Sequence, residues 1–100
     1  MKTVMVRYRV KADSAEENER LVRAVYEELA ASRPAGLRYA TFKLDDGVSF
    51  VHVAATETAG ENPLLGVGAF AEFTKDVRSR CEEPPVTSEL HEVGSFEFWR

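Results

Sequence analysis

Apolar and polar residues alternate near the start of the chain. Between Thr3 and Lys11 every second side chain is apolar, and these positions are Val4, Val6, Tyr8 and Val10. A period of two in β-branched and aromatic residues is typical of a strand with one buried face. The segment therefore predicts an opening strand, which Asp13 and Ser14 end.

An amphipathic helix is predicted for residues 15–31. Ser14 and Glu17 have the spacing of a capping box, in which both side chains satisfy backbone N–H groups at the helix start. One apolar stripe faces a core and consists of Leu21, Val22, Val25 and Leu29. On the opposite side, opposite charges four residues apart predict the ion pairs Glu16–Arg20 and Glu19–Arg23. Pro34 and Gly36 then end the helix.

Two strands, residues 37–44 and 48–56, flank the turn-forming sequence Asp45-Asp46-Gly47. The pair Asp46-Gly47 favours a two-residue type I′ turn, in which both central residues adopt a positive φ. Such a turn fixes which residues of the hairpin lie opposite each other. The pairs expected on one face are Ala40–Val53, Phe42–Val51 and Leu44–Ser49, and those on the other are Tyr39–Ala54, Thr41–His52 and Lys43–Phe50.

A second helix and a last strand complete the pattern. Asn62 and Pro63 suit the cap and the first position of a short helical turn. A helix is then predicted for residues 68–81, with the apolar stripe Phe70, Phe73, Val77 and Cys81. The sequence Glu82-Glu83-Pro84-Pro85 predicts its end. A last strand is predicted for residues 87–99, with Phe96, Phe98 and Trp99 near its end.

The predicted element order is β-α-β-β-α-β. This order favours the α+β class and the ferredoxin-like fold, in which two helices cover one face of a four-stranded antiparallel sheet. Residues 1–100 are expected to form one domain, since that length is ordinary for a single domain. The helix side of the sheet is predicted to carry Val4, Val6, Tyr8, Val10, Ala40, Phe42, Val51 and Val53. The opposite face is predicted to carry Met5, Arg7, Arg9, Tyr39, Thr41, Phe50, His52 and Ala54.

The predicted second face of the sheet is too apolar to remain in water, because it would carry Met5, Tyr39 and Phe50. A sheet from a second copy of the chain would cover it, so we predict a homodimer with two-fold symmetry. The aromatic end of the chain, residues 96–99, is the candidate for reaching across to the partner.

Composition narrows the classes of function. Of 100 residues, 44% are hydrophobic and 30% are charged, which is typical of a folded protein. Thirteen Lys and Arg against seventeen Asp and Glu give a net charge of −4, which argues against a nucleic-acid-binding surface. Cys81 is the only cysteine, so neither a disulfide nor a metal site with His52 and His91 is expected. Without a signal-peptide pattern or a membrane span, we expect a cytoplasmic protein.

Over nearly its whole length, the chain resembles the antibiotic biosynthesis monooxygenase group of the dimeric α/β-barrel superfamily. The resemblance rests on the opening strand 4–11, the Glu-rich first helix and three short sequences, which are Phe50-Val51-His52-Val53, Phe70-Ala71-Glu72-Phe73 and Glu92-Val93-Gly94-Ser95-Phe96. It implies a homodimer whose two sheets close into a dimeric α/β barrel. The ligand cavity would lie between each sheet and its helices, or inside the barrel. Members of this superfamily include cofactor-independent quinone-forming monooxygenases, haem-degrading enzymes and lactone isomerases.

Several positions depart from the haem-degrading members of this superfamily. Those members use a His on the second helix as the axial ligand, and residues 68–81 contain no His. They also place an Asn on the first strand, where this chain has Met5 and Arg7. Haem degradation is therefore not expected, and no cofactor is predicted. The quinone-forming members rely on Asn, Trp and Tyr, for which Tyr39 and Asn62 are the loose matches.

His52 is the main candidate for a catalytic residue. An imidazole can accept a proton from a phenol or an enol, because its pKa lies near neutral pH. Thr41, Tyr39 and Phe50 are expected beside it. The alternative is a hydrogen-bonded His at a dimer interface. The other candidates for lining a ligand pocket are Met5, Arg7, Arg9, Phe70 and Phe73.

Arg7 and Arg9 are expected to lie on the same face as His52. Their paired N–H groups can bind a carboxylate or a phenolate. They can also pair with Glu92 or Glu97 of the neighbouring strand, or with the other subunit.

The sequence leaves three functions open. The first is a small monooxygenase or isomerase that acts on a hydrophobic aromatic or polyketide-like compound in a cavity of ~300 Å³ or more. The second is a non-catalytic homodimeric domain that binds a ligand or has a filled interior. The third is a dimerisation module, which would expose an apolar patch beyond the dimer contact.

Overall fold

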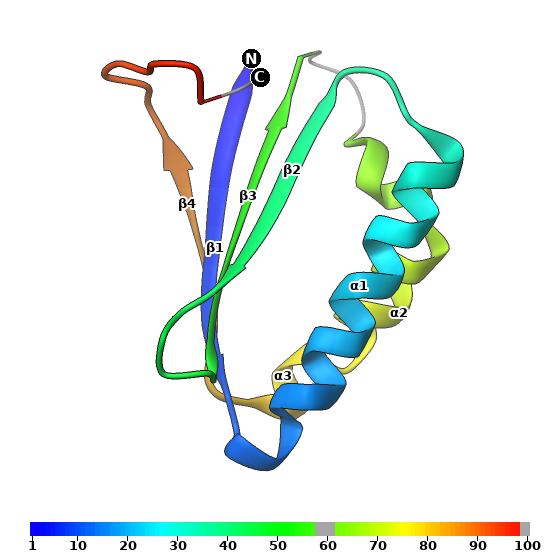
Figure 1. The fold of residues 1–100 in the computed structure, drawn as a ribbon, viewed down its shortest axis with the longest axis vertical. Coiled ribbons are helices and arrows are strands. Elements are labelled where there is room, and N and C mark those ends of the chain that lie inside the picture. Colours follow the sequence, from blue (N-terminus) through cyan, green and yellow to red (C-terminus); the bar gives the residue numbers. More distant parts are fainter. Residues whose placement is uncertain (58–61, 99–100) are drawn as a thin grey trace.

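The computed structural model describes residues 1–57 and 62–98 (Figure 1). Four strands form a sheet, and the helices are three α-helices and two short 3₁₀ segments, η1 and η2, in these residues. In chain order the elements are β1 Lys2–Val10, η1 Ala12–Ser14, α1 Ala15–Ser32, β2 Leu37–Lys43, β3 Ser49–Thr56, η2 Pro63–Gly66, α2 Gly68–Lys75, α3 Val77–Arg80 and β4 Cys81–Leu90.

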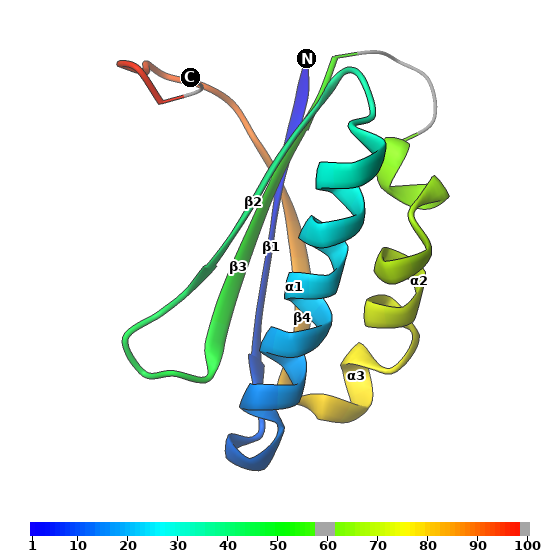
Figure 2. The same cartoon turned by 45° about the vertical axis from the view of Figure 1, so that its right-hand side comes forward.

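The strands lie in the order β2-β3-β1-β4, and each neighbouring pair is antiparallel. Helices α1, α2 and α3 pack on one face of this sheet, and no element of the described residues covers the other face (Figures 1 and 2). The predicted α+β ferredoxin-like fold is therefore confirmed. No helix in the described residues is long and apolar enough to cross a membrane.

The faces of β2 and β3 are the reverse of those predicted. In β1, Val6 lies opposite His52, and Tyr8 lies opposite Phe50. Because residues that lie opposite each other point to the same face, His52 and Phe50 face the helices together with Val6 and Tyr8. The same holds for Tyr39, Thr41 and Ala54, and the open face carries Ala40, Phe42, Val51 and Val53 instead.

The hairpin between β2 and β3 has the predicted register and a different turn. Thr41 pairs with His52, and Phe42 pairs with Val51, as expected. Gly47 has a φ of 76°, whereas Asp46 is not among the residues with positive φ, so the turn is not type I′. The Asp46 carboxylate instead accepts hydrogen bonds from the backbone N–H groups of Val48 and Ser49, at 2.9 and 2.8 Å. These bonds hold the loop without a second left-handed residue.

Helix α1 begins without the predicted capping box. Ser14 makes no capping hydrogen bond to the helix, and Glu17 pairs with Arg20 through two contacts of 2.7 Å. Arg20 therefore binds Glu17 and not the predicted Glu16, while the predicted Glu19–Arg23 pair does form. A carboxylate drawn to a guanidinium one turn away is no longer free to cap the helix start.

The end of the chain differs most from the sequence prediction. The helix expected over residues 68–81 is broken at Asp76 into α2 and α3. The last strand begins at Cys81 and ends at Leu90, so the residues expected to end the helix lie in β4. Pro84 and Pro85 are tolerated because β4 is an edge strand, and its register against β1 shifts there. Phe96 and Phe98 lie beyond the strand and are exposed, and Trp99 lies outside the described residues.

The two main helices are joined by a charged cap. Glu28 of α1 accepts hydrogen bonds from the backbone N–H groups of Gly68 and Ala69, at 3.1 and 2.8 Å. These two N–H groups belong to the first turn of α2, where the helix leaves donors unpaired and carries partial positive charge. The carboxylate thus fixes the start of α2 against α1, which places Phe70 and Phe73 over the sheet.

Candidate functional site

A cavity of about 180 Å³ lies between the sheet and the helices. Its wall on the sheet side comes from β1, β2, β3 and β4, and its other wall from η2, α2 and α3. Apolar side chains dominate the lining. The lining residues are Val4, Val6, Tyr8, Tyr39, His52, Ala54, Asn62, Leu64, Phe70, Phe73, Thr74, Val77 and Pro85.

His52 lies in the wall of this cavity and is only 5% exposed. Its two ring nitrogens contact different tyrosines. Nε2 lies 2.8 Å from the Tyr8 hydroxyl, and Nδ1 lies 2.6 Å from the Tyr39 hydroxyl. Nδ1 also lies 3.1 Å from the hydroxyl of Thr41. The imidazole is therefore held from both sides, and its orientation is fixed.

A chain of hydrogen bonds leads from Arg80 through Asn18 to Tyr8. The Arg80 guanidinium, which carries only donors, gives a hydrogen bond of 3.2 Å to the Asn18 carbonyl oxygen. The Asn18 amide nitrogen in turn donates to the Tyr8 hydroxyl oxygen at 2.9 Å. The Tyr8 hydroxyl keeps its proton and a second lone pair for Nε2 of His52, so it can donate to Nε2 or accept from it. In the tautomer in which Tyr8 donates to Nε2, a neutral His52 carries its proton on Nδ1 and donates it toward Tyr39.

Burial keeps all three partners in their neutral forms. Loss of solvent lowers the pKa of His52 to about 4, so its imidazole is uncharged at neutral pH. Burial also raises the pKa of Tyr8 and that of Tyr39 well above the ordinary value for tyrosine. Tyr39 thus keeps its hydroxyl proton and, in the tautomer in which it accepts from His52, can donate that proton to a third group.

The structure gathers some of the candidate site residues and separates others. Tyr39, Phe70 and Phe73 line the cavity with His52. Thr41 is not in the lining, but its hydroxyl contacts Nδ1 of the imidazole. Phe50 stacks on Tyr8, at 5.6 Å between ring centroids. Its side chain is buried outside the cavity lining.

The arginines lie away from this site. Arg7 and Met5 alternate with the helix-facing residues of β1, so they occupy the open face, and the prediction that Arg7 and Arg9 share a face with His52 is wrong. Arg9 pairs with Glu82 and Glu83 of the neighbouring strand β4, at 3.6 and 2.9 Å, and not with the expected Glu92 or Glu97.

Three residues that hold His52 were not identified from the sequence. The alternating pattern predicts only a core position for Tyr8, and the predicted site includes neither Asn18 nor Arg80. Asn18 is fully buried in α1. The apolar stripe predicted for this helix does not include it. An Asn on the buried side of an amphipathic helix is a signal that could have been used, because a buried amide needs partners. Arg80 carried no such signal, since its burial follows from the break at Asp76.

Comparisons with known proteins agree on the fold. No protein-family model matches the sequence, and no curated protein matches it. Among solved structures, a putative antibiotic biosynthesis monooxygenase from Nitrosomonas europaea is similar with a TM-score of 0.76, 19% identity and coverage of 94% of this chain and 100% of the other. A putative antibiotic biosynthesis monooxygenase from Caulobacter crescentus gives a TM-score of 0.71 at 19% identity, with coverage of 93% and 90%.

A third similar structure is a mutant of SnoaB, a cofactor-independent oxygenase from Streptomyces nogalater. Its TM-score is 0.69 at 17% identity, and the alignment covers 96% of each chain. This chain has the fold of the antibiotic biosynthesis monooxygenase proteins. At these identities the likeness concerns the fold, so the chemistry must be argued from the cavity and its residues.

Proposed function

We propose that this chain is a small cofactor-independent monooxygenase that acts on a phenol or an enolisable ring compound. The observation that carries the proposal is the Tyr8–His52–Tyr39 arrangement in the wall of an apolar cavity. In the tautomer in which Nδ1 of His52 donates to Tyr39, the Tyr39 hydroxyl can donate its own proton to an oxygen of the substrate. Such a donor stabilises the negative charge of a substrate that has given its proton to solvent and binds as the anion.

A buried positive charge lies behind Phe73, outside the lining of the cavity, and favours an anionic substrate. Arg80 is 7% exposed, and it pairs with no carboxylate among the described residues. Its guanidinium donates to the Phe73 carbonyl oxygen at 2.9 Å and lies 5.4 Å from the centroid of the Phe73 ring, which lines the cavity. A cation in a poorly solvated position favours an anion close by. A phenolate or an enolate would meet this requirement.

The reaction needs no external electron donor. The electrons for dioxygen come from the substrate anion itself, so a phenol and O₂ give a quinone and water. One oxygen atom enters the ring as the new carbonyl, and the other leaves as water with the hydrogens that the ring loses. In this scheme His52 is a positioning residue that polarises Tyr39. The role of proton acceptor, expected from the sequence, fits this tautomer less well.

The volume of the cavity limits the size of the substrate. An apolar cavity of ~150 Å³ accepts one benzene ring, and this cavity measures about 180 Å³. This volume is smaller than the ~300 Å³ expected from the sequence, so the cavity suits a compound with one ring and small substituents. A polyketide of several fused rings would require Asn62, Leu64 or Phe70 to move outward, since these residues close the side opposite the sheet.

Oxygen uptake with single-ring phenols tests the proposal. We expect the protein to consume O₂ and form the quinone in a ratio of one to one, without added metal or flavin. Tyr39→Phe removes the donor and should lower kcat by about 10²–10³-fold. Tyr26→Phe is the matched control, because Tyr26 stacks on Tyr39 and bonds to Thr41 outside the cavity. Equal rates in the two variants would contradict the role of Tyr39.

A non-catalytic ligand-binding domain is the second candidate function. It is favoured by the fact that both ring nitrogens of His52 are bonded within the protein. In this case the same phenols would bind in the cavity and be released unchanged. Binding without O₂ uptake would decide for this second function, and a protein that binds no phenol at all would exclude both.

We further propose that two copies associate through the open face of the sheet. This face carries apolar side chains from all four strands, although those from β2 and β3 are not the ones predicted. Phe42 is 51% exposed and Val86 is 63% exposed, and Met5, Ala40, Val51 and Val53 lie between them. A two-fold dimer would bury this surface in one self-complementary contact.

A further inference from the structure

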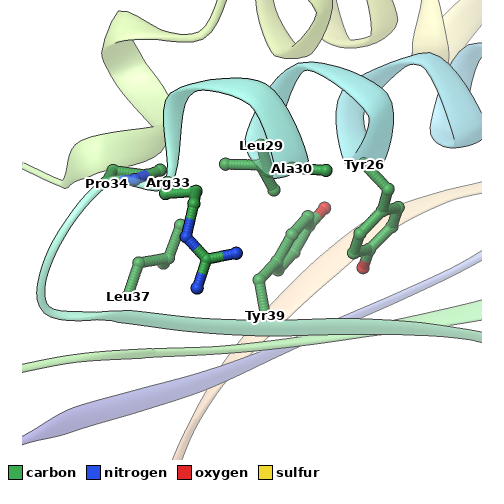
Figure 3. Close-up of a pocket in the computed structure, with 7 residues that line it drawn as sticks. All are labelled: Tyr26, Leu29, Ala30, Arg33, Pro34, Leu37 and Tyr39. Carbon is green, nitrogen blue, oxygen red and sulfur yellow. The ribbon is translucent and has the colours of Figure 1, made fainter.

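A second pocket lies on the outer side of Tyr39, between α1 and the edge strand β2. Its volume is about 410 Å³, which is within the range of small-molecule sites. One wall is the end of α1 with Tyr26, Leu29 and Ala30, and the other is β2 with Leu37 and Tyr39 (Figure 3). Tyr39 lines this pocket and the inner cavity, so its ring separates the two spaces.

Arg33 supplies the only charge in the lining of this pocket. Figure 3 shows its side chain extending from the end of α1 into the space between Leu37 and Tyr39. No carboxylate of residues 1–57 and 62–98 forms an ion pair with it. The remaining side chains in the lining are apolar or aromatic, so the guanidinium faces the pocket without a counter-charge.

A neighbouring pocket continues the same groove between α1 and β2, and its cations form ion pairs, unlike Arg33. This pocket is lined by Arg23 and Lys43, and both form ion pairs with Glu19, so the three charges leave a net charge of +1. The two pockets meet at Tyr26, which lines both. Arg33 thus differs from the other two cations of this groove in forming no ion pair with the described residues, which leaves its guanidinium available to an external anion.

The backbone of Arg33 adds an independent observation. Its φ of 45° and ψ of 59° place it in the left-handed region, where it caps α1 by donating its N–H to the carbonyl oxygen of Leu29 at 2.8 Å. Glycine is the usual residue at such a position, because a side chain strains this conformation. A strained residue that carries a long cationic side chain into a pocket points to a function for that side chain.

We propose that this pocket binds a monocarboxylate with an apolar ring. The carboxylate would pair with Arg33 through two parallel N–H···O bonds, and the ring would pack between Leu29, Leu37 and the Tyr26–Tyr39 pair. Those two tyrosines are stacked at 5.2 Å between centroids, and their hydroxyls are engaged by Thr41 and His52. They therefore present ring surface to the ligand. This site goes beyond the proposed oxygenase and does not depend on it.

Titration with benzoate and with benzamide tests the site. The two compounds have the same ring and differ in charge, so we expect benzoate to bind at least tenfold more tightly. Benzoate should shift the methyl NMR signals of Leu29, Ala30 and Leu37. Arg33→Gln should weaken benzoate binding at least tenfold and leave benzamide unchanged. Arg33→Lys should give an intermediate affinity, because a lysine keeps the charge and loses the planar pair of donors.

Two further variants separate this site from the inner cavity and from a structural role of Arg33. Ala54→Leu fills the inner cavity and should leave benzoate binding intact; its loss would place the ligand in the inner cavity and overturn the proposal. Arg33→Gly relieves the left-handed backbone, so it should raise the melting temperature while abolishing benzoate binding. Equal affinities for benzoate and benzamide, or benzoate binding that Arg33→Gly preserves, would also overturn it.

Discussion

At the scale of single residues, His52 is held by more partners than its place in the sequence indicates. The sequence located it correctly beside Thr41 and Tyr39, because those pairs follow from the register of a local hairpin. Tyr8, Asn18 and Arg80 come from distant parts of the chain, and their hydrogen bonds join residues 44, 10 and 62 positions apart. Local periodicity carries no information on such contacts, so this part of the site required the three-dimensional fold.

The low pKa of His52 makes the stability of the protein depend on pH. In the folded state the pKa is about 4, and in the unfolded chain it returns to 6.5. Between these values the unfolded state binds more protons, so the free energy of unfolding falls as the pH falls from about 6.5 to about 4. This difference between the two pKa values of His52 corresponds to about 3 kcal/mol in the free energy of unfolding.

Urea denaturation across this pH range checks the effect. The control is His52→Gln, whose amide offers one acceptor and one donor and does not titrate. Between pH 6.5 and pH 4, we expect the free energy of unfolding of the wild type to fall by about 3 kcal/mol more than that of His52→Gln. The exposed carboxylates with lowered pKa, such as Glu17 and Glu19, are present in both proteins and cancel in the comparison. Parallel stability curves would show that His52 titrates normally.

At the scale of elements, the hairpin could be predicted and its orientation could not. The alternating pattern correctly predicted which residues of β2 and β3 share a face. It did not predict which of these two faces meets the helices. Both faces are apolar, however, since one carries Tyr39, Phe50 and His52 and the other carries Phe42 and Val51. Which face meets the helices is decided by the pairing of β1 with β3, and a shift of one residue there reverses it. Hydrophobicity alone therefore could not predict which face of β2 and β3 meets the helices.

The contact between α1 and α2 gives a prediction at this scale. Glu28→Ala removes the carboxylate that accepts from Gly68 and Ala69, and it leaves two backbone donors at the start of α2 without this partner. We expect a loss of about 1–2 kcal/mol in the free energy of unfolding, as for other capping residues. Amide exchange at Gly68 and Ala69 should accelerate more than exchange in the sheet.

The neighbouring residue provides the control for this experiment. Glu27 is exposed on the same helix, so Glu27→Ala changes the helix propensity and the net charge in the same way as Glu28→Ala. Its effect on the free energy of unfolding should stay within ~0.5 kcal/mol. Equal losses in the two variants would mean that the effect comes from charge and not from the cap.

At the scale of the whole molecule, the open face of the sheet raises the question of what covers its apolar side chains. The helices cover one face, and the described residues leave the other uncovered (Figure 2). The prediction of an apolar second face survives the reversal of β2 and β3, because valines and Phe42 replace Tyr39 and Phe50 there. A monomer would hold these side chains in water, and a second copy removes them from it.

The proposed dimer can be tested at Phe42, the aromatic side chain of the open face. Phe42→Lys places a charge in the apolar contact, so we expect the dimer dissociation constant to rise by at least 100-fold. Leu65→Lys is the control, because Leu65 is 69% exposed on η2, away from the sheet face. Sedimentation equilibrium should give twice the 11.2 kDa chain mass for the wild type and Leu65→Lys, and the single mass for Phe42→Lys. A wild type that sediments as one chain would exclude the dimer, whereas a dimeric Phe42→Lys would place the contact elsewhere. Since Phe42 is already half exposed in the single chain, the substitution changes the folded monomer little, and a change in mass reports on association.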